Sequence, residues 1–402
     1  MRWLGIFGAA LLAACTKTPR EDALDGGAEG DGGTAVPGTS DDGATGLGSG
    51  GGSGDGTTSA DPVADSSGGT TGAQNCECAP GTDLIYVVSE DGELWSFDPE
   101  REAFALVGPL ACGGFRPYSM AIDRTGRAWL LLLDDVPLAL IAKGMFTVDI
   151  NDPSDCQAVA YTAGLFGVFG MSFVDNPPPA TCEQLFVHSY SGQGPFAEGD
   201  GIGMLGMLDA DDALQVVSST DFDGAELAGT SEGRLFSLAG NDPVKVIEYD
   251  RESGEELSRL DVEGVEKTGA SAMAYYGGDF YLFTEAGAPD CDPCMQKRCA
   301  DELAACDADP ECGPIYDCLL ASGGDGLPGC MGDIVGPGGP LRDCMVTECP
   351  AECSAANVVS RVTHIDHDDS DGGGQGIDTL ATLAPIRVVG AASSTCVPVF
   401  VP

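Results

Sequence analysis

The chain has 402 residues and carries 64 acidic against 18 basic side chains, which gives a formal net charge of −46 at pH 7. A charge this negative disfavours nucleic acid and anionic lipid headgroups as partners, and it favours solubility and cationic partners. We therefore expect no nucleic-acid partner.

The N-terminal segment predicts secretion. Residues 1–14, MRWLGIFGAALLAA, contain one arginine, a short apolar core and small residues at the end, which is typical of a signal peptide. The apolar run is too short for a helix across a bilayer core of about 30 Å, which needs roughly 20 residues. The segment is therefore expected to be removed rather than to span a membrane.

The end of this segment, Leu12, Ala13, Ala14 and Cys15, resembles the lipobox of bacterial lipoproteins. The resemblance implies cleavage before Cys15, acylation of that residue and a mature protein held in the cell envelope by lipid. An ordinary signal peptide, with Cys15 as one more disulfide partner, is the alternative. Parity favours the lipid, because removing Cys15 from the 17 cysteines leaves an even number for an oxidising compartment. Thr16, in place of an aspartate, points to the outer membrane.

Residues 15–75 form the next segment. After Cys15 it has no aromatic residue, is rich in glycine, serine and threonine, and holds ten acidic against two basic side chains. Such a composition buries too little apolar surface to fold. We expect a lipid-anchored, disordered acidic linker that leads to a folded domain.

From residue 76 the chain alternates short β-rich segments with turns of glycine, aspartate and proline. Aligning these segments on an aspartate that ends a short apolar strand reveals an internal repeat. The five anchors are Asp98 (LWSFD), Asp149 (MFTVD), Asp209 (LGMLD), Asp250 (VIEYD) and Asp366 (VTHID). A second strand precedes each anchor, and a strand of small residues precedes four of these. VVGAASS, from Val388, supplies the missing small-residue strand from the other end of the chain.

The spacing of the anchors locates an insertion. Asp250 and Asp366 are 116 residues apart, and removing the cysteine-rich residues 287–355 leaves 47. Repeats of about 40 to 50 residues with about four strands each resemble the blades of the β-propeller superfold. That resemblance implies an all-β, five-bladed propeller over residues 76–286 and 356–402, closed by the C-terminal strand. A β-sandwich is the alternative.

The sequence of residues 287–355 predicts a small, mainly helical module. It resembles the cysteine-dense modules of bacterial surface proteins. Cys299, Leu303 and Cys306 share one face of a helix, and a second short helix follows. A segment this small needs disulfides for its stability. The alternative is zinc held by two closely spaced pairs, Cys291 with Cys294 and Cys349 with Cys353. Behind a secretion signal, disulfides are favoured.

Every cysteine except Cys15 is expected in a disulfide. These residues are Cys76, Cys78, Cys112, Cys156, Cys182, Cys291, Cys294, Cys299, Cys306, Cys312, Cys318, Cys330, Cys344, Cys349, Cys353 and Cys396. Closure of the ring would bring the two ends of the propeller together. A bond from Cys76 or Cys78 to Cys396 is therefore expected to lock it.

Metal chemistry has two candidate places. His364 and His367 project to opposite faces of a continuous strand, so they share a metal only if a turn intervenes; His188 is expected as a packed strand residue. The run DHDDSDGGGQGID, residues 366–378, suits calcium, which prefers several oxygen ligands in flexible loops. Its candidate ligands are Asp366, Asp368, Asp369 and Asp371. A solvated turn is the alternative, because the other repeats carry polar turns at the same place.

No motif for nucleophilic catalysis occurs in the sequence, so no catalytic residue is predicted. The sequence favours a lipid-anchored binding or surface-structural protein of the cell envelope, with no cofactor unless it is calcium. Its expected partners are the membrane, through the anchor, and a protein or saccharide ligand at the cell surface. The alternative is a calcium-assisted secreted propeller enzyme, either a hydrolase or a lyase.

Overall fold

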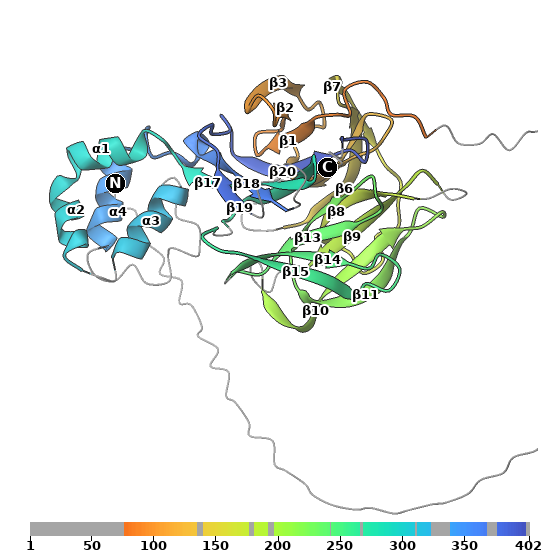
Figure 1. Cartoon of the computed structure of the whole chain (residues 1–402). Helices are drawn as coiled ribbons and strands as arrows, with labels where there is room; N and C mark the ends of the chain where they lie inside the picture. The colour runs from red at the N-terminus through yellow and green to blue at the C-terminus, as the bar shows by residue number, and fades with distance from the viewer. Residues whose placement is uncertain are drawn as a thin grey trace, which may run out of the picture. The chain divides into compact units, whose positions relative to one another are not determined.

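The fold comes from a computed structural model of the chain (Figure 1). The structure describes residues 76–134, 140–176, 181–191, 197–241, 243–265, 268–309, 312–322, 338–367 and 376–398. The signal peptide, Cys15 and the linker expected over residues 15–75 lie outside these residues.

Five antiparallel sheets of four strands each make up the β part of the chain. The innermost strands are β20 (Val388–Ser393), β4 (Arg116–Ile122), β8 (Val168–Asp175), β12 (Glu226–Gly229) and β16 (Ser271–Tyr276). The second strands are β1 (Ile85–Ser89), β5 (Arg127–Leu133), β9 (Glu183–Tyr190), β13 (Leu235–Ala239) and β17 (Asp279–Gly287). The third strands are β2 (Glu93–Asp98), β6 (Ala142–Asp149), β10 (Glu198–Leu208), β14 (Val244–Tyr249) and β18 (Val359–Asp366). The outermost strands are β3 (Ala103–Pro109), β7 (Asp152–Ala158), β11 (Leu214–Phe222), β15 (Glu256–Val262) and β19 (Gly376–Thr379).

The five sheets form a closed ring. Each innermost strand contacts the innermost strands of both neighbouring sheets, in the order β20, β4, β8, β12, β16 and back to β20. In the first sheet β20 pairs with β1, with Val87 opposite Ala391, so the C-terminal strand lies beside the first strand (Figure 1). The five-bladed propeller with C-terminal closure is confirmed. The β-sandwich alternative is wrong, because five sheets follow one another around a closed ring, whereas a sandwich has two sheets packed on each other.

Small residues on the innermost strands follow from how closely these strands approach one another. A Cβ atom on Gly170 of β8 would lie 2.4 Å from the carbonyl oxygen of Ala225, and one on Gly229 of β12 would lie 2.0 Å from that of Phe173. Both distances are far below van der Waals contact. Only glycine therefore fits at these two positions of the β8–β12 contact.

Serine hydroxyls connect the inner edges of neighbouring blades. The Ser119 hydroxyl of β4 accepts the backbone N–H of Met171 at 3.2 Å, and the Ser172 hydroxyl of β8 accepts that of Gly229 at 2.8 Å. An inner strand is the edge of its sheet, so its outward backbone groups need partners from elsewhere. The serine side chains supply such partners, and they take up less space than a further hydrogen-bonded strand would.

The repeated aspartates cap the turn between the third and the outermost strand. The Asp209 carboxylate accepts the backbone N–H groups of Asp211 and Ala213, both at 2.9 Å, and Asp250 accepts that of Ser253 at 2.7 Å. Asp98 and Asp149 accept corresponding N–H groups. Aspartate favours such turns because its short carboxylate reaches its own backbone. The anchor of the repeat is thus a local turn signal.

The outermost strands were not predicted from the sequence as separate elements. β7 and β15 are mostly exposed and have polar sequences, DPSDCQA and ELSRLDV. In β7 the turn occupies only residues 150–151, and the polar segment beyond it pairs with β6. A strand exposed on both faces lacks the alternation of apolar and polar residues that marks most strands.

The described residues of the insertion between β17 and β18 form four helices and one short 3₁₀ turn. These are α1 (Cys291–Arg298), α2 (Ala300–Asp307), α3 (Gly313–Ser322), α4 (Gly338–Glu348) and η1 (Ala355–Asn357). The expected helix through Cys299 is interrupted at that residue, which lies between α1 and α2 and contributes its side chain to the buried cluster. Among the described residues the bonds are Cys291–Cys353, Cys294–Cys349, Cys299–Cys344 and Cys306–Cys312. The four cysteines of the zinc alternative are therefore paired with one another as disulfides.

We predict that Gly229→Ala destabilises the propeller by about 2 kcal/mol or more, because its Cβ would collide with the Phe173 carbonyl group. The matched control is Gly167→Ala, whose Cβ would meet nothing within 4 Å and which should stay within about 0.5 kcal/mol of the wild type. Chemical denaturation of the full-length protein measures both. Equal stabilities for the two variants would contradict the close approach of β8 and β12.

Candidate functional site

A cavity of about 270 Å³ lies at the end of the ring where the innermost strands begin. All five blades contribute to its wall. The first blade contributes Glu90, Arg387 and Val389; the second Arg116, Pro117, Tyr118, Leu133 and Leu140; the third Tyr190; the fourth Gly224 and Glu226; and the fifth Gly269, Ala270 and Ser271. We call this cavity the channel mouth.

Two half-buried tyrosines form the aromatic part of the channel mouth. The rings of Tyr118, on β4, and Tyr190, at the end of β9, lie 6.4 Å apart between centroids and are inclined by 28°. Burial raises the pKa of both phenols, and nearby carboxylates add to the effect, Glu226 at Tyr118 and Asp223 at Tyr190. Both hydroxyls therefore stay protonated at neutral pH and can donate hydrogen bonds.

Two buried carboxylates stand beside the tyrosines. Glu226, at the start of β12, is 7% exposed, and its Oε2 accepts a hydrogen bond from the Ser119 hydroxyl at 3.1 Å. Asp223 is fully buried and accepts the backbone N–H and the hydroxyl of Ser191, at 2.8 and 2.9 Å. These hydrogen bonds hold the carboxylates in place, so the acceptors of the mouth are preorganised.

Arg387, just before β20, is another fixed residue of the wall of the mouth. Its guanidinium forms ion pairs with Glu90 and with the buried Glu285. Burial lowers the pKa of Arg387, but the two carboxylates outweigh that effect and raise it. Glu285 also accepts the backbone N–H of Gly269 at 2.9 Å, so the same carboxylate orders the loop of the fifth blade that lines the cavity.

The mouth has a small excess of negative charge. Its wall carries two carboxylates, Glu90 and Glu226, and two guanidinium groups, Arg116 and Arg387. Asp223 and Glu285 lie directly behind it. With aromatic faces, fixed acceptors and protonated donors in one cavity, the arrangement can bind a small polar molecule, and it disfavours an anionic one.

None of these residues stood out from the sequence alone. Tyr118 directly precedes the small-residue strand SMAID, Glu226 begins ELAGT and Arg387 precedes VVGAASS. A comparison of the residues at the start of each small-residue strand, across the five repeats, could have identified them.

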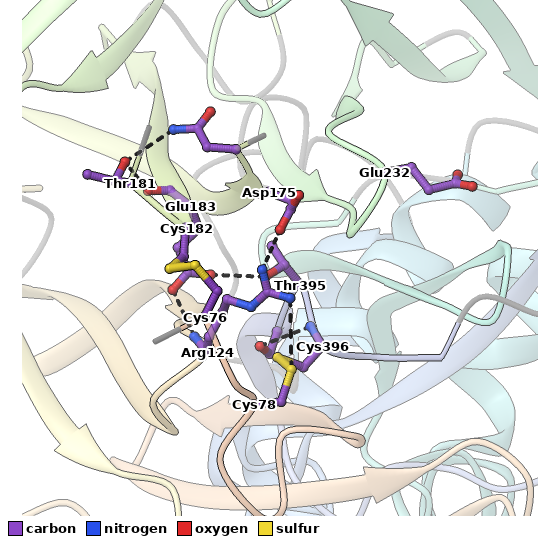
Figure 2. A network of polar contacts seen from close by, with 12 residues as sticks. Cys76, Cys78, Arg124, Asp175, Thr181, Cys182, Glu183, Glu232, Thr395 and Cys396 are labelled. Carbon is purple, nitrogen blue, oxygen red and sulfur yellow. Dashed lines mark hydrogen bonds and ion pairs between the residues drawn. A yellow bond between two sulfur atoms is a disulfide. The ribbon is translucent and has the colours of Figure 1, made fainter. Parts of the chain in front are cut away.

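At the other end of the ring, two disulfides attach the segment that begins at Cys76 to the propeller (Figure 2). Cys76 bonds to Cys182 at the start of the third blade's β9, and Cys78 bonds to Cys396 just beyond β20. Of the two partners expected for Cys396, Cys76 and Cys78, the structure has Cys78. The backbone N–H of Ala79 also donates to the carbonyl oxygen of Arg124 at 2.8 Å. We call residues 76–79 the strap.

Arg124 and Glu183 connect the blades beneath the strap (Figure 2). Arg124 forms an ion pair with Asp175, and its backbone N–H donates to Glu183 Oε1 at 2.8 Å. The hydroxyl of Thr395 donates to Glu183 Oε2 at 3.0 Å. Burial nevertheless raises the pKa of Glu183 to about 7, because desolvation outweighs these hydrogen bonds.

The histidines have structural partners. His188 is buried, and its Nε2 lies 2.9 Å from the Thr220 hydroxyl oxygen. His364 Nε2 lies 2.9 Å from Asp279 Oδ2, and this hydrogen bond raises the pKa of His364. The backbone N–H of His367 donates to the other oxygen of Asp279, at 2.9 Å. A carboxylate from β17 thus connects the two histidines of the fifth blade.

The predicted calcium ligands are only partly covered by the structure. Asp366 ends β18, whereas Asp368, Asp369 and Asp371 lie outside the described residues, as do Cys330 and the side chain of Cys318. Within the part of the chain that the structure describes, no group of three or more His, Cys, Asp or Glu side chains could hold a metal ion. No helix in that part is both long and apolar enough to cross a membrane.

No family model matches the sequence, and no curated protein matches it. Solved structures with some likeness include a luciferin-regenerating enzyme, 13% identical over 53% of this chain and 68% of its own, with a TM-score of 0.33. YjhT is 10% identical over 55% of this chain and 74% of its own, with a TM-score of 0.33. Dihydro-heme d1 dehydrogenase NirN is 17% identical over 52% of this chain and 41% of its own, with a TM-score of 0.27. Likenesses this distant carry no argument about function.

We predict that Glu183 makes stability fall as pH rises. Its folded-state pKa, about 7, is above the ordinary value of 4.5, so the stabilisation is complete below about pH 4.5 and is lost as pH rises through about 7. The free energy of unfolding of the wild type should fall by an amount on the order of 2 kcal/mol across this pH window, and Glu183→Gln should abolish that fall. Denaturation curves of the full-length protein at several pH values measure it.

The matched control is Glu232→Gln, which changes an exposed glutamate in the same region (Figure 2). Its stability should run parallel to that of the wild type at every pH. If the stability of Glu183→Gln also ran parallel to that of the wild type at every pH, burial would not shift the pKa of the Glu183 carboxyl group.

We predict that the double variant Cys78→Ser with Cys396→Ser loses about 3 kcal/mol of stability, since this bond joins two residues 318 apart in sequence. Hydrogen exchange in β20 should accelerate at least tenfold, because the closing strand loses its covalent attachment. The control is Cys112→Ser with Cys156→Ser, which removes a bond at the outer strands and should leave exchange in β20 unchanged. Equal exchange in both variants would contradict a closing role for Cys78–Cys396.

Proposed function

We propose that this protein is a lipid-anchored propeller of the bacterial cell envelope, held in the outer membrane, that binds a neutral saccharide at its channel mouth. The lipobox-like sequence that ends at Cys15 and the even number of remaining cysteines support the anchor. The composition of the mouth supports the ligand.

The observation that carries the proposal is a cavity, lined by residues of all five blades, that holds aromatic, acidic and basic groups together. A sugar ring presents an apolar face that packs on an aromatic ring such as Tyr118 or Tyr190. Its hydroxyls can donate to the Glu226 carboxylate and accept from a guanidinium group, as at Arg116, or from a phenol. The cavity lies near the lower end of the usual size range for small-molecule sites, which suits a single ring.

Charge separates a neutral sugar from an acidic one. Glu226 and Asp223 are buried next to the tyrosines, where a further carboxylate would meet repulsion at low effective dielectric. A hexose of about twelve non-hydrogen atoms at about 0.3 kcal/mol each would bind with about 4 kcal/mol, which is a dissociation constant near 1 mM. Glucuronate should therefore bind more weakly than glucose.

We predict that Tyr190→Ala weakens binding of neutral monosaccharides about tenfold, because the sugar loses an aromatic face. Titration of the full-length protein with glucose, galactose, mannose and N-acetylglucosamine, followed by ligand-observed NMR, measures the affinities. The matched control is Tyr161→Ala, which removes a half-buried tyrosine that packs on Phe169 outside the cavity, and it should keep wild-type affinity.

Two outcomes would overturn the proposal. One is the absence of binding for all four neutral sugars in the wild-type protein. The other is an equal loss of affinity in both tyrosine variants, which would place the ligand elsewhere.

A further inference from the structure

A second cavity adjoins the channel mouth. It has a volume of about 550 Å³, and its wall shares Glu90 and Arg387 with the mouth. The rest of its wall comes from Ser89 and Asp91 in the first blade, from Pro385 and Ile386 before β20, and from Pro289, Asp290 and residues 356–359 beside β17 and β18. We call it the side groove, because it runs between the first and fifth blades.

Arg387 forms the boundary between the two cavities, and it is held from both sides. Its Nε donates to Glu285 Oε1 at 2.6 Å, and its guanidinium also pairs with Glu90. The backbone N–H of Glu90 donates to the carbonyl oxygen of Arg387 at 3.1 Å. Glu285 is almost fully buried, whereas the side chain of Glu90 is 36% exposed. The ion pairs thus fix Arg387 and Glu90, which line both cavities.

The side groove is polar and open to solvent. Asp91, Asp290 and Asn357 are exposed on its wall and offer hydrogen-bond acceptors, and the Asn357 amide also fixes the root of the insertion by donating to the Ala351 carbonyl oxygen at 2.6 Å. Ile386 and Val358 supply apolar surface between these polar groups. With Glu90, Asp91 and Asp290 on the wall against Arg387, an anionic chain is disfavoured.

We infer that the two cavities form one extended site, in which a neutral oligosaccharide places one sugar in the channel mouth and continues past Arg387 into the side groove. This inference rests on the proposed function and adds to it the length and direction of the ligand. The mouth alone suits one ring, while the two volumes together reach the size of sites that hold larger ligands. Hydroxyls along such a chain can donate hydrogen bonds to the carboxylate and amide oxygens on the groove wall.

The test compares one neutral sugar with its own tetramer, using N-acetylglucosamine and its β-1,4-linked tetramer, by calorimetric titration of the full-length protein. We expect the tetramer to bind at least tenfold more tightly than the monomer. Ala356→Trp places a large side chain on the exposed wall of the side groove. It should reduce the tetramer affinity to that of the monomer and leave the monomer affinity unchanged.

The matched control is Ala103→Trp, at an exposed position on the outermost strand β3, away from both cavities. It should keep the tenfold preference for the tetramer. Monomer binding with no preference for the tetramer, or a preference that survives Ala356→Trp, would overturn the side groove and leave the channel mouth standing. Failure of both sugars to bind would overturn the channel mouth as well.

Discussion

The propeller is closed by the pairing of its C-terminal strand, β20, with its first strand, β1. This pairing joins Ala391 to Val87, across almost the whole length of the propeller sequence, and completes the first blade. Without it, the first blade would lack its innermost strand and β1 would be a free edge. The same pairing brings Arg387 beside Glu90 and Glu285, so the wall of the channel mouth exists only in the closed ring.

The two ends of the ring have different chemistry. At the strap end, disulfides from Cys76 and Cys78 and the contacts of Arg124 join three blades to the segment that enters the propeller. These groups contact one another, and their contacts stabilise the closed ring. At the mouth, tyrosines and carboxylates surround open space. The contacts that stabilise closure and the proposed ligand site thus lie at opposite ends of the same five strands.

The fold was predictable where the sequence carries local signals. The anchors from Asp98 to Asp250 indicate turns, because their carboxylates accept hydrogen bonds from the backbone of the turn. The small residues of the innermost strands reflect how closely these strands approach one another, as at Gly229. The outermost strands were not predictable as elements, because exposure on both faces leaves no hydrophobic pattern. The mouth was also missed: Tyr118, Glu226 and Arg387 are far apart in sequence, and only the closed ring brings them together.

Photocrosslinking of the full-length protein with a neutral monosaccharide that carries a diazirine, followed by peptide mapping, would locate the ligand site. We expect label on the peptides that contain Tyr118, Tyr190 and residues 269–271, and we expect unlabelled sugar to compete for it. Label confined to the strap end, near Arg124 and Glu183, or label that unlabelled sugar does not displace, would contradict a ligand site at the channel mouth.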